Sequence, residues 1–418
     1  MLATTAADFS ALRSALPKDE SLVLFTTSHL RRPSDFAKDE SEQRTPDLYA
    51  FVLPSHTGDV RTARLGPLDA ITRNIDAWNT ALADRDVALS TVNTRGRSLE
   101  LTLRQPILKA GAGLHWLVLP TAALYRMPWA ALPDGERYLA DSGFRAHELN
   151  HERELLAPAL PAGSPRLLAV ADPVAGEPSS LVSRGCTRNL VALPGSRRET
   201  EGLDALWHAH FGDTAKSTVL VGADATEANL RAAAGTADIV HFGTHGISLA
   251  DDCSAGDKEL AVRGFTLAAD APLDTDTPAL APAALLLAPG AAHAGTDDDG
   301  LLTAEEIAGL DLTHTRWAVL AACSTAAGTT HRYEGLFGLA RAFRLAGAHT
   351  VLTSLWPVDD AATAEWTQAL YVAHIEHGLD TAASMAEAQR TVLAARRARG
   401  DSLHPYYWAA FVASGDWR

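Results

Sequence analysis

A histidine and a cysteine follow two apolar runs of this sequence in the same way. In ADIVHFGTHG, residues 237–246, His245 comes just past a strand-like stretch, and in RWAVLAACSTAAG, residues 316–328, Cys323 ends another. Both stretches predict buried strands. Because parallel strands end at the same edge of a sheet, the two side chains project from one edge if their strands are neighbours. A thiol nucleophile needs this arrangement, since a nearby imidazole accepts its proton and the thiolate attacks.

Backbone groups at the same positions extend this hypothesis. The N–H groups of Gly246 and Cys323 would face a developing oxyanion, and a glycine permits close approach of the substrate. Each site residue also has a purely structural interpretation. Cys323 fits a packing residue, because free cysteine is among the most buried residue types, and His245 fits a turn. The spacing alone leaves both interpretations open.

The other histidine and cysteine positions do not predict a metal centre. His241 and His245 are four residues apart, which on a strand means roughly 13 Å, too far to share one ion as the two histidines of a helical HExxH motif do. His241 is instead predicted to be a buried, hydrogen-bonded strand residue. Cys186 and Cys253 lie in polar, loop-like segments without a CxxC pair. We expect no metal, no cofactor, no disulfide framework and a reducing, cytoplasmic compartment.

Length and charge narrow the class of protein. A chain of 418 residues with 47% hydrophobic residues predicts a soluble protein of two domains. The net charge of -15 argues against nucleic acid as a direct partner, because phosphate binding needs a basic surface. No stretch approaches the roughly 20 uninterrupted apolar residues that span a bilayer, and the N-terminus lacks a signal peptide pattern. We therefore expect no membrane partner.

Strand-like and helix-like segments alternate along the chain, which predicts an α/β fold with a mainly parallel sheet covered on both faces. A segment rich in Pro, Gly and Ala at residues 157–166 predicts a boundary, which gives domains 1–158 and 159–418. Strands are predicted within residues 21–27, 48–54, 113–120, 166–173, 217–222, 237–246, 316–323 and 349–356, and helices at 68–82, 199–212, 225–235 and 334–348.

Individual residues mark the ends and faces of these elements. Thr226 is a predicted N-cap, and Thr303 with Glu306 has capping-box spacing.

Residues 250–299 predict a long insertion with a flexible loop close to the site, because they follow His245. Three aromatic side chains are predicted to lie in the core rather than to bind a ligand: Trp317, Trp408 and Phe411.

Several motifs, taken together and in order, resemble the CHAT domain, a caspase-like cysteine peptidase family related to separase. They are IVHFGTHG, LLTAEEIAGLDL, VLAACSTAAG, EGLFGLARAFRLAGAHTVLTSLWPVDDAAT and HPYYWAAFVASGD, with further matches upstream to about Ser21. The resemblance implies a caspase-like α/β/α sandwich with His245 and Cys323 as a catalytic dyad. It also implies that residues 1–158 form an inactive caspase-like domain, a pseudo-protease, before the CHAT protease domain of residues 159–418.

Two departures from the family pattern bear on activity. Members usually read Ser-Ala-Cys-Glu-Thr-Gly, whereas here Ser324 follows the thiol, and many relatives carry repeat or sensor domains that this chain lacks. The expected function is a cysteine endopeptidase that cleaves a partner protein, in bacterial defence or cell-death signalling, with a separate activator or sensor protein. The alternative is a non-catalytic caspase-like scaffold that binds a partner.

A pair of aspartates suggests the specificity. In SLWPVDDAATAEW, residues 354–366, a helix is predicted to begin after Asp359 and Asp360, and only one of them is the N-cap. The other carboxylate is left at the sheet edge, where a buried carboxylate needs a cation. In separase-like relatives an acidic residue in the similar stretch recognises arginine before the scissile bond. The resemblance therefore implies substrate binding by Asp360, with Asp359 beside it, and cleavage after Arg or Lys.

Overall fold

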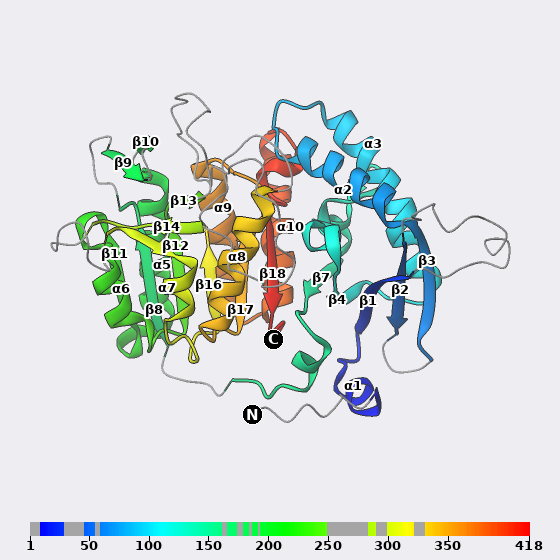
Figure 1. The fold of residues 1–418 in the computed structure, drawn as a ribbon, viewed down its shortest axis with the longest axis horizontal. Coiled ribbons are helices and arrows are strands. Elements are labelled where there is room, and N and C mark those ends of the chain that lie inside the picture. The colour runs from blue at the N-terminus through cyan, green and yellow to red at the C-terminus, as the bar shows by residue number, and fades with distance from the viewer. Residues whose placement is uncertain are drawn as a thin grey trace. The chain divides into compact units, whose positions relative to one another are not determined.

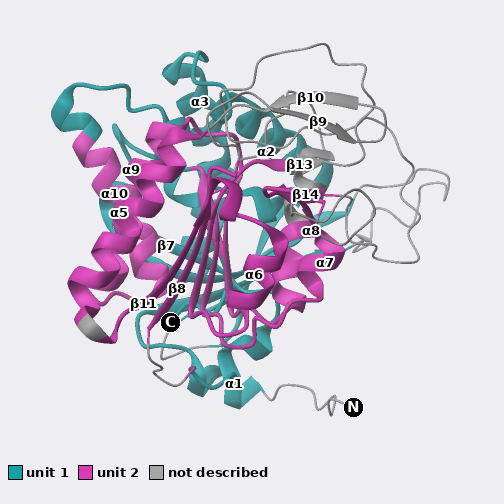
Figure 2. Cartoon of the chain, turned by 90° about the vertical axis from the view of Figure 1, so that its left-hand side faces the viewer, with its two compact units in different colours: residues 1–159, 396–409, 414–418 teal, residues 160–395, 410–413 magenta. Residues whose placement is uncertain are grey.

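The structure is a computed structural model in two compact units (Figures 1 and 2). It describes residues 9–28, 46–54, 59–160, 165–173, 179–183, 186–190, 193–248, 283–289, 299–321 and 331–418. The first unit comprises residues 1–159, 396–409 and 414–418, and the second comprises residues 160–395 and 410–413. That residues 1–158 are an inactive caspase-like domain stays a prediction.

Five parallel strands form the centre of the second unit, which confirms the predicted fold class. In spatial order they are β11 (Lys216–Val221), β8 (Arg166–Ala171), β12 (Ile239–Gly243), β16 (Trp317–Leu320) and β17 (Thr350–Ser354). Strands β12, β16 and β17 are buried at every residue. Continuous apolar runs of this kind are typical of parallel strands that helices cover on both faces.

Helices cover both faces of this sheet (Figure 2). One face carries α5 (Pro194–Phe211), α9 (Asp360–Tyr371) and α10 (Thr381–Arg399), and the other carries α6 (Glu227–Ala234), α7 (Ala304–Ala308) and α8 (His331–Leu345). On the second face, Phe343 of α8 packs against Phe242 of β12, with ring centroids 5.4 Å apart. This packing confirms that the helix after the cysteine covers the sheet.

Local signals begin and end these helices as the sequence predicts. The side chain of Thr226 accepts a hydrogen bond from the Asn229 N–H at the start of α6. Thr303 and Glu306 form a complete capping box at the start of α7. Gly347 follows α8 with φ +107°, and a Cβ there would lie 2.9 Å from the Thr313 backbone nitrogen. Glycine is therefore required where this chain turns away.

A small antiparallel sheet corrects the predicted insertion. Strand β14 (Ala283–Leu286) lies within residues 250–299, between β13 (Gly246–Ser248) and β15 (Leu301–Thr303). All four residues of β14 are buried, so their backbone groups need hydrogen-bond partners, and pairing with the neighbouring strands supplies them. Most of the predicted loop lies outside the described residues.

The first unit is built on a mixed sheet of parallel and antiparallel strands. Strands β7 (Arg145–Glu148), β4 (His115–Leu119) and β1 (Glu20–Ser28) run parallel, and β2 (Asp47–Leu53) and β3 (Arg61–Pro67) continue antiparallel. Its helices are α1 (Phe9–Ala15), α2 (Leu68–Leu82), α3 (Leu89–Leu99) and α4 (Gln105–Lys109). The buried face of α2 includes Ile71, Ile75 and Trp78, as its spacing predicts.

Shorter elements complete the described chain. Two hairpins pair β5 (Pro133–Asp134) with β6 (Arg137–Tyr138), and β9 (Ser179–Ser183) with β10 (Cys186–Leu190). Cys186 therefore begins a strand, which corrects its predicted loop. Helical turns occupy Glu100–Arg104, Ala122–Arg126, Trp129–Ala131, Leu139–Ser142, Glu152–Leu156, Gly212–Thr214, Gly222–Asp224, Val372–Glu376 and Pro405–Tyr407. Strand β18 (Phe411–Gly415) is divided between the units.

The aromatic residues predicted for the core are buried. Trp317 and Phe411 are 2% exposed and Trp408 is 1% exposed. Phe411 stacks on Trp366, with ring centroids 3.9 Å apart. Among the described helices, none has the length and apolar character to cross a membrane.

A buried acid lies in the sheet of the first unit. Glu148 ends β7, opposite Val118 of β4, and its Oε1 has no hydrogen-bond partner. Burial raises the pKa of Glu148 well above its ordinary value. A buried polar group that lacks a partner costs about 1–3 kcal/mol, so this side chain opposes folding.

Replacing this acid should stabilise the protein in a pH-dependent way. The folded state holds the Glu148 proton more tightly than the unfolded state, so wild-type stability falls as pH rises above the ordinary carboxyl pKa. Glu148→Gln does not titrate. We expect its melting temperature to exceed that of wild type at pH 8, with a smaller difference at pH 5. Glu136→Gln, at an exposed position, is the matched control; an equal pH slope in all three proteins would refute the assignment.

Candidate active site

His245 lies at the carboxyl end of β12 and is 4% exposed. Three hydrogen bonds fix the backbone around it. The Asp172 N–H donates to the Gly243 carbonyl at 3.3 Å, and the Leu286 N–H donates to the His245 carbonyl at 2.8 Å. The Thr244 hydroxyl donates to the Leu286 carbonyl. The histidine is therefore held between β8 on one side and β14 on the other.

Gly246 begins β13 directly after the histidine and is paired with Leu285. Because the neighbouring bond joins the Leu286 N–H to the His245 carbonyl, Gly246 and Leu285 form a non-hydrogen-bonded pair of the antiparallel ladder. The ladder with β14 therefore does not use the Gly246 N–H. This geometry is compatible with the predicted oxyanion contact.

Strand β16, which leads to the cysteine, is the direct neighbour of β12. The two run parallel, with Ile239 opposite Trp317 and Phe242 opposite Leu320. The two strands are therefore neighbours, as the dyad predicted from the sequence requires. Cys323 itself lies outside the described residues, which end at Ala321 on this strand. The Cys323–His245 dyad therefore stays a prediction.

His241 is fully buried in β12, as predicted. Its Nδ1 lies 3.0 Å from the Tyr371 hydroxyl and its Nε2 lies 3.0 Å from Glu199 Oε1. Burial, together with the nearby Glu199 carboxylate, raises the pKa of Tyr371 well above its ordinary value. The sequence analysis missed both partners. Glu199 lies at the start of the predicted helix at residues 199–212, and no local pattern indicates its contact with His241.

Asp172 is a second residue that the sequence analysis missed. It follows β8 with φ +41°, a conformation that short polar residues tolerate better than others. Its buried carboxylate accepts hydrogen bonds from the Leu193 N–H at 2.8 Å and from Arg197 Nε at 3.2 Å. Asp172 therefore joins the ends of β8 and β12 to the first turn of α5. Its position near the end of the stretch predicted as a strand, residues 166–173, was the available signal.

Asp359 and Asp360 make different contacts in the structure. Asp359 is the N-cap of α9, and its side chain accepts a hydrogen bond from the Ala362 N–H at 2.8 Å. The Asp360 carboxylate lies against Gly195 in the first turn of α5, in the space that a Cβ on Gly195 would fill. Both side chains are half-buried.

One group of described residues in the first unit has metal-ligand spacing: Asp19, Glu20 and His115. Arg145 already lies among them, with Nη2 at 3.1 Å from Asp19 and from Glu20 and at 2.8 Å from His115 Nδ1. A guanidinium is therefore the cation that these carboxylates hold.

Comparison with known proteins identifies the family. The sequence model of the CHAT domain matches residues 93–416. The chain belongs to the CHAT domain family. Tetratricopeptide repeat protein 28 of Mus musculus is 36% identical to this CHAT chain over 115 residues, and its Homo sapiens counterpart is 35% identical. The match covers 28% of the CHAT chain but only 4% of either relative, so it concerns a small part of those proteins.

Solved structures that are similar to this chain have low sequence identity to it. Separase of Saccharomyces cerevisiae, in its complex with securin, is 10% identical with a TM-score of 0.52, over 97% of the CHAT chain and 30% of the separase chain. The Arg-specific cysteine proteinase gingipain R is 8% identical with a TM-score of 0.41, over 84% of the CHAT chain and 74% of its own. The likeness to separase confirms the predicted caspase-like fold of the CHAT chain.

A close contact behind His245 provides a test of this geometry. A Cβ on Gly243 would lie 2.9 Å from the Cβ of Ser196. Gly243→Ala should therefore destabilise the protein by about 1–3 kcal/mol, the usual cost of overpacking. Ser196→Gly should relieve part of this loss in the double variant, whereas Ser196→Ala, which keeps the Cβ, should not. Equilibrium unfolding of the double-mutant cycles measures the coupling, and additive effects would contradict the contact.

Proposed function

We propose that this CHAT chain is a cysteine endopeptidase in which Cys323 is the nucleophile and His245 the general base. The parallel pairing of β12 with β16 carries the proposal. Cys323 follows Ala321 by two residues, and consecutive Cα atoms are 3.8 Å apart, so the Cys323 Cα lies within about 7.6 Å of the Ala321 Cα. This tether keeps the thiol near the edge of the sheet where β12 delivers His245.

The proposed reaction needs only groups of the chain and water. His245 takes the proton of the Cys323 thiol and the resulting thiolate attacks the peptide carbonyl, while the oxyanion accepts hydrogen bonds from the N–H groups of Gly246 and Cys323. His245 then gives the proton to the leaving amine. Water, deprotonated by His245, attacks the thioester and releases the acid with the thiol restored.

The partner of the proposed reaction is a protein substrate, in bacterial defence or cell-death signalling. A separate activator or sensor protein would control it, a proposal that fits the separase neighbour, whose structure was solved in complex with securin. A non-catalytic scaffold is the second candidate, and Ser324 in place of the usual glutamate favours it. A pull-down with Cys323→Ala should retain the substrate.

Asp360 is the proposed recognition residue for Arg or Lys before the scissile bond. The half-buried carboxylate follows β17, a parallel strand next to β16, and therefore lies toward the edge where His245 lies. Asp359 serves as the helix cap, and Asp360 is proposed because it falls on the position of the acidic residue in the similar stretch of separase-like relatives.

The proposed dyad predicts the outcome of two substitutions and one labelling experiment. Cys323→Ala and His245→Ala should each reduce cleavage of the partner protein by more than about 1,000-fold, because members of a catalytic unit act together. An electrophilic thiol probe should label Cys323 far faster than Cys186 or Cys253 near pH 7. Cys186→Ala is the control and should keep full activity. Equal, slow labelling of all three cysteines would favour the scaffold.

Specificity is tested with paired variants of the two aspartates. Asp360→Asn should lower kcat/KM for substrates with Arg or Lys before the scissile bond, and it should leave thiol labelling of Cys323 unchanged. Asp359→Ser retains a capping oxygen and should preserve the preference. Substrate profiling that finds cleavage after acidic or apolar residues would exclude Asp360 as the specificity residue.

A further inference from the structure

The antiparallel sheet of β13, β14 and β15 connects His245 to a buried carboxylate. Residues 286–288 at the end of β14 are held on two sides. On one side the Leu286 N–H donates to the His245 carbonyl at 2.8 Å. On the other side the Leu287 N–H donates to the Gly300 carbonyl and the Ala288 N–H to the Ala225 carbonyl, both at 2.8 Å. The position of the histidine backbone therefore depends on what fixes Gly300.

Glu227 fixes Gly300. This residue opens α6 directly after the Thr226 cap, is fully buried, and accepts a hydrogen bond from the Gly300 N–H at 3.1 Å. Gly300 has φ +87°, and a Cβ there would lie 2.9 Å from the Leu287 carbonyl oxygen. The chain can make this turn only with glycine, and the glycine presents both its N–H and its carbonyl to the bonds described.

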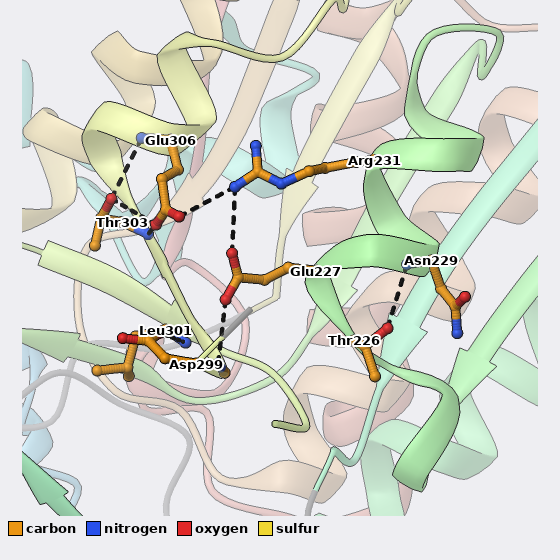
Figure 3. Close-up of polar contacts among 9 residues, drawn as sticks. Thr226, Glu227, Asn229, Arg231, Asp299, Leu301, Thr303 and Glu306 are labelled. Carbon is orange, nitrogen blue, oxygen red and sulfur yellow. Dashed lines mark hydrogen bonds and ion pairs between the residues drawn. The ribbon is translucent and has the colours of Figure 1, made fainter. Parts of the chain in front are cut away.

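One guanidinium lies between two carboxylates in this cluster (Figure 3). Arg231 Nη2 is 3.2 Å from Glu227 Oε2 and 3.1 Å from Glu306 Oε1. The other oxygen of Glu306 accepts hydrogen bonds from the N–H and the hydroxyl of Thr303, which ends β15 and is the N-cap of α7. Asp299 is exposed and accepts from the Leu301 N–H at 2.9 Å. Helix α6, Gly300 and α7 are therefore tied together through Glu227 and Arg231.

We propose that Glu227 is a positioning residue of the candidate active site, which acts on His245 through Gly300 and the end of β14. The proposal rests on the proposed function, because it assigns a role relative to the proposed base. The route consists of consecutive contacts: Glu227 to Gly300, Gly300 to Leu287, and Leu286 to His245. Glu227 touches none of the proposed reacting atoms.

The charge of Glu227 changes within the neutral range. Burial and the nearby Glu306 carboxylate raise the pKa of Glu227 to about 7, against the hydrogen bond from Gly300 and the contact with Arg231, which lower it. An opened cluster would return the carboxyl group to water and to its ordinary pKa. The closed cluster therefore prefers the protonated acid, and rising pH between these two values favours opening.

Hydrogen exchange tests the connection without any activity. After correction for intrinsic exchange rates, protection of the Leu286, Leu287 and Gly300 amides in the full chain should fall by up to tenfold per pH unit below about pH 7 and level off above it. Glu227→Gln, whose amide oxygen still accepts from Gly300, should show constant protection. Amides of β8 serve as the reference. Equal pH slopes in wild type and Glu227→Gln would overturn the proposal.

Kinetics then test whether the connection matters for the site. The ratio of kcat/KM for Glu227→Gln to that of wild type should be near one at pH 5.5 and should rise with a midpoint near pH 7. Glu306→Gln, which retains a capping-box residue, should shift this midpoint to lower pH, because it removes a charge that raises the Glu227 pKa. Glu305→Gln, exposed on the same helix, should change nothing.

The outcomes separate this proposal from the proposed function. A flat kcat/KM ratio in an enzyme with rapid thiol labelling would mean that Glu227 is only structural and would overturn the positioning role. Glu227→Ala, which cannot accept from Gly300, should lose activity at every pH, whereas Glu227→Gln should retain it. If no variant labels rapidly but Glu227→Gln still removes the pH dependence of exchange, the route from Glu227 to His245 holds and the peptidase assignment fails.

Discussion

The pairing of β12 between β8 and β16 is the constraint on which the proposed site depends. Every residue of β12 is buried, as is typical of a parallel strand covered on both faces, and β12 pairs in parallel with both of its neighbours. This pairing aligns the ends of three strands at one edge. His245 follows β12, Asp172 follows β8, and β16 leads toward Cys323. Backbone pairing therefore positions the residues of the proposed site, and side-chain contacts then hold them in place.

Most of these side-chain contacts come from the first turns of α5. Ser196 approaches Gly243 so closely that no side chain fits between them, while Asp172 binds the backbone at Leu193. One turn later, Glu199 reaches His241. Burial of these polar groups away from water strengthens each contact and makes an unpaired group costly. The helix therefore fixes the end of β12 through polar contacts as well as through its apolar face.

Local sequence patterns predicted the elements well, because each depends on neighbouring residues. Helical periodicity predicts α2, and capping chemistry predicts that Thr226 and Thr303 begin helices. Apolar runs predict the parallel strands. The partners of buried polar groups depend on distant segments that no local pattern contains. Glu199 meets His241 only after α5 has packed on the sheet. The short apolar run of β14 lies within a segment rich in Ala, Pro and Asp, a composition that predicts a loop, and only pairing with β13 and β15 makes it a strand.

Two buried glutamates illustrate how structure distinguishes a cost from a function. Glu148 is buried and has an oxygen without a hydrogen-bond partner, so its burial lowers stability. Glu227 is equally removed from water, yet it accepts a backbone hydrogen bond and contacts a guanidinium that a second carboxylate shares. Its bonds lead by consecutive contacts to the backbone of His245. Removing the Glu227 side chain would therefore leave the Gly300 N–H and the shared guanidinium without one of their partners, which is the costly way to lose a buried hydrogen bond.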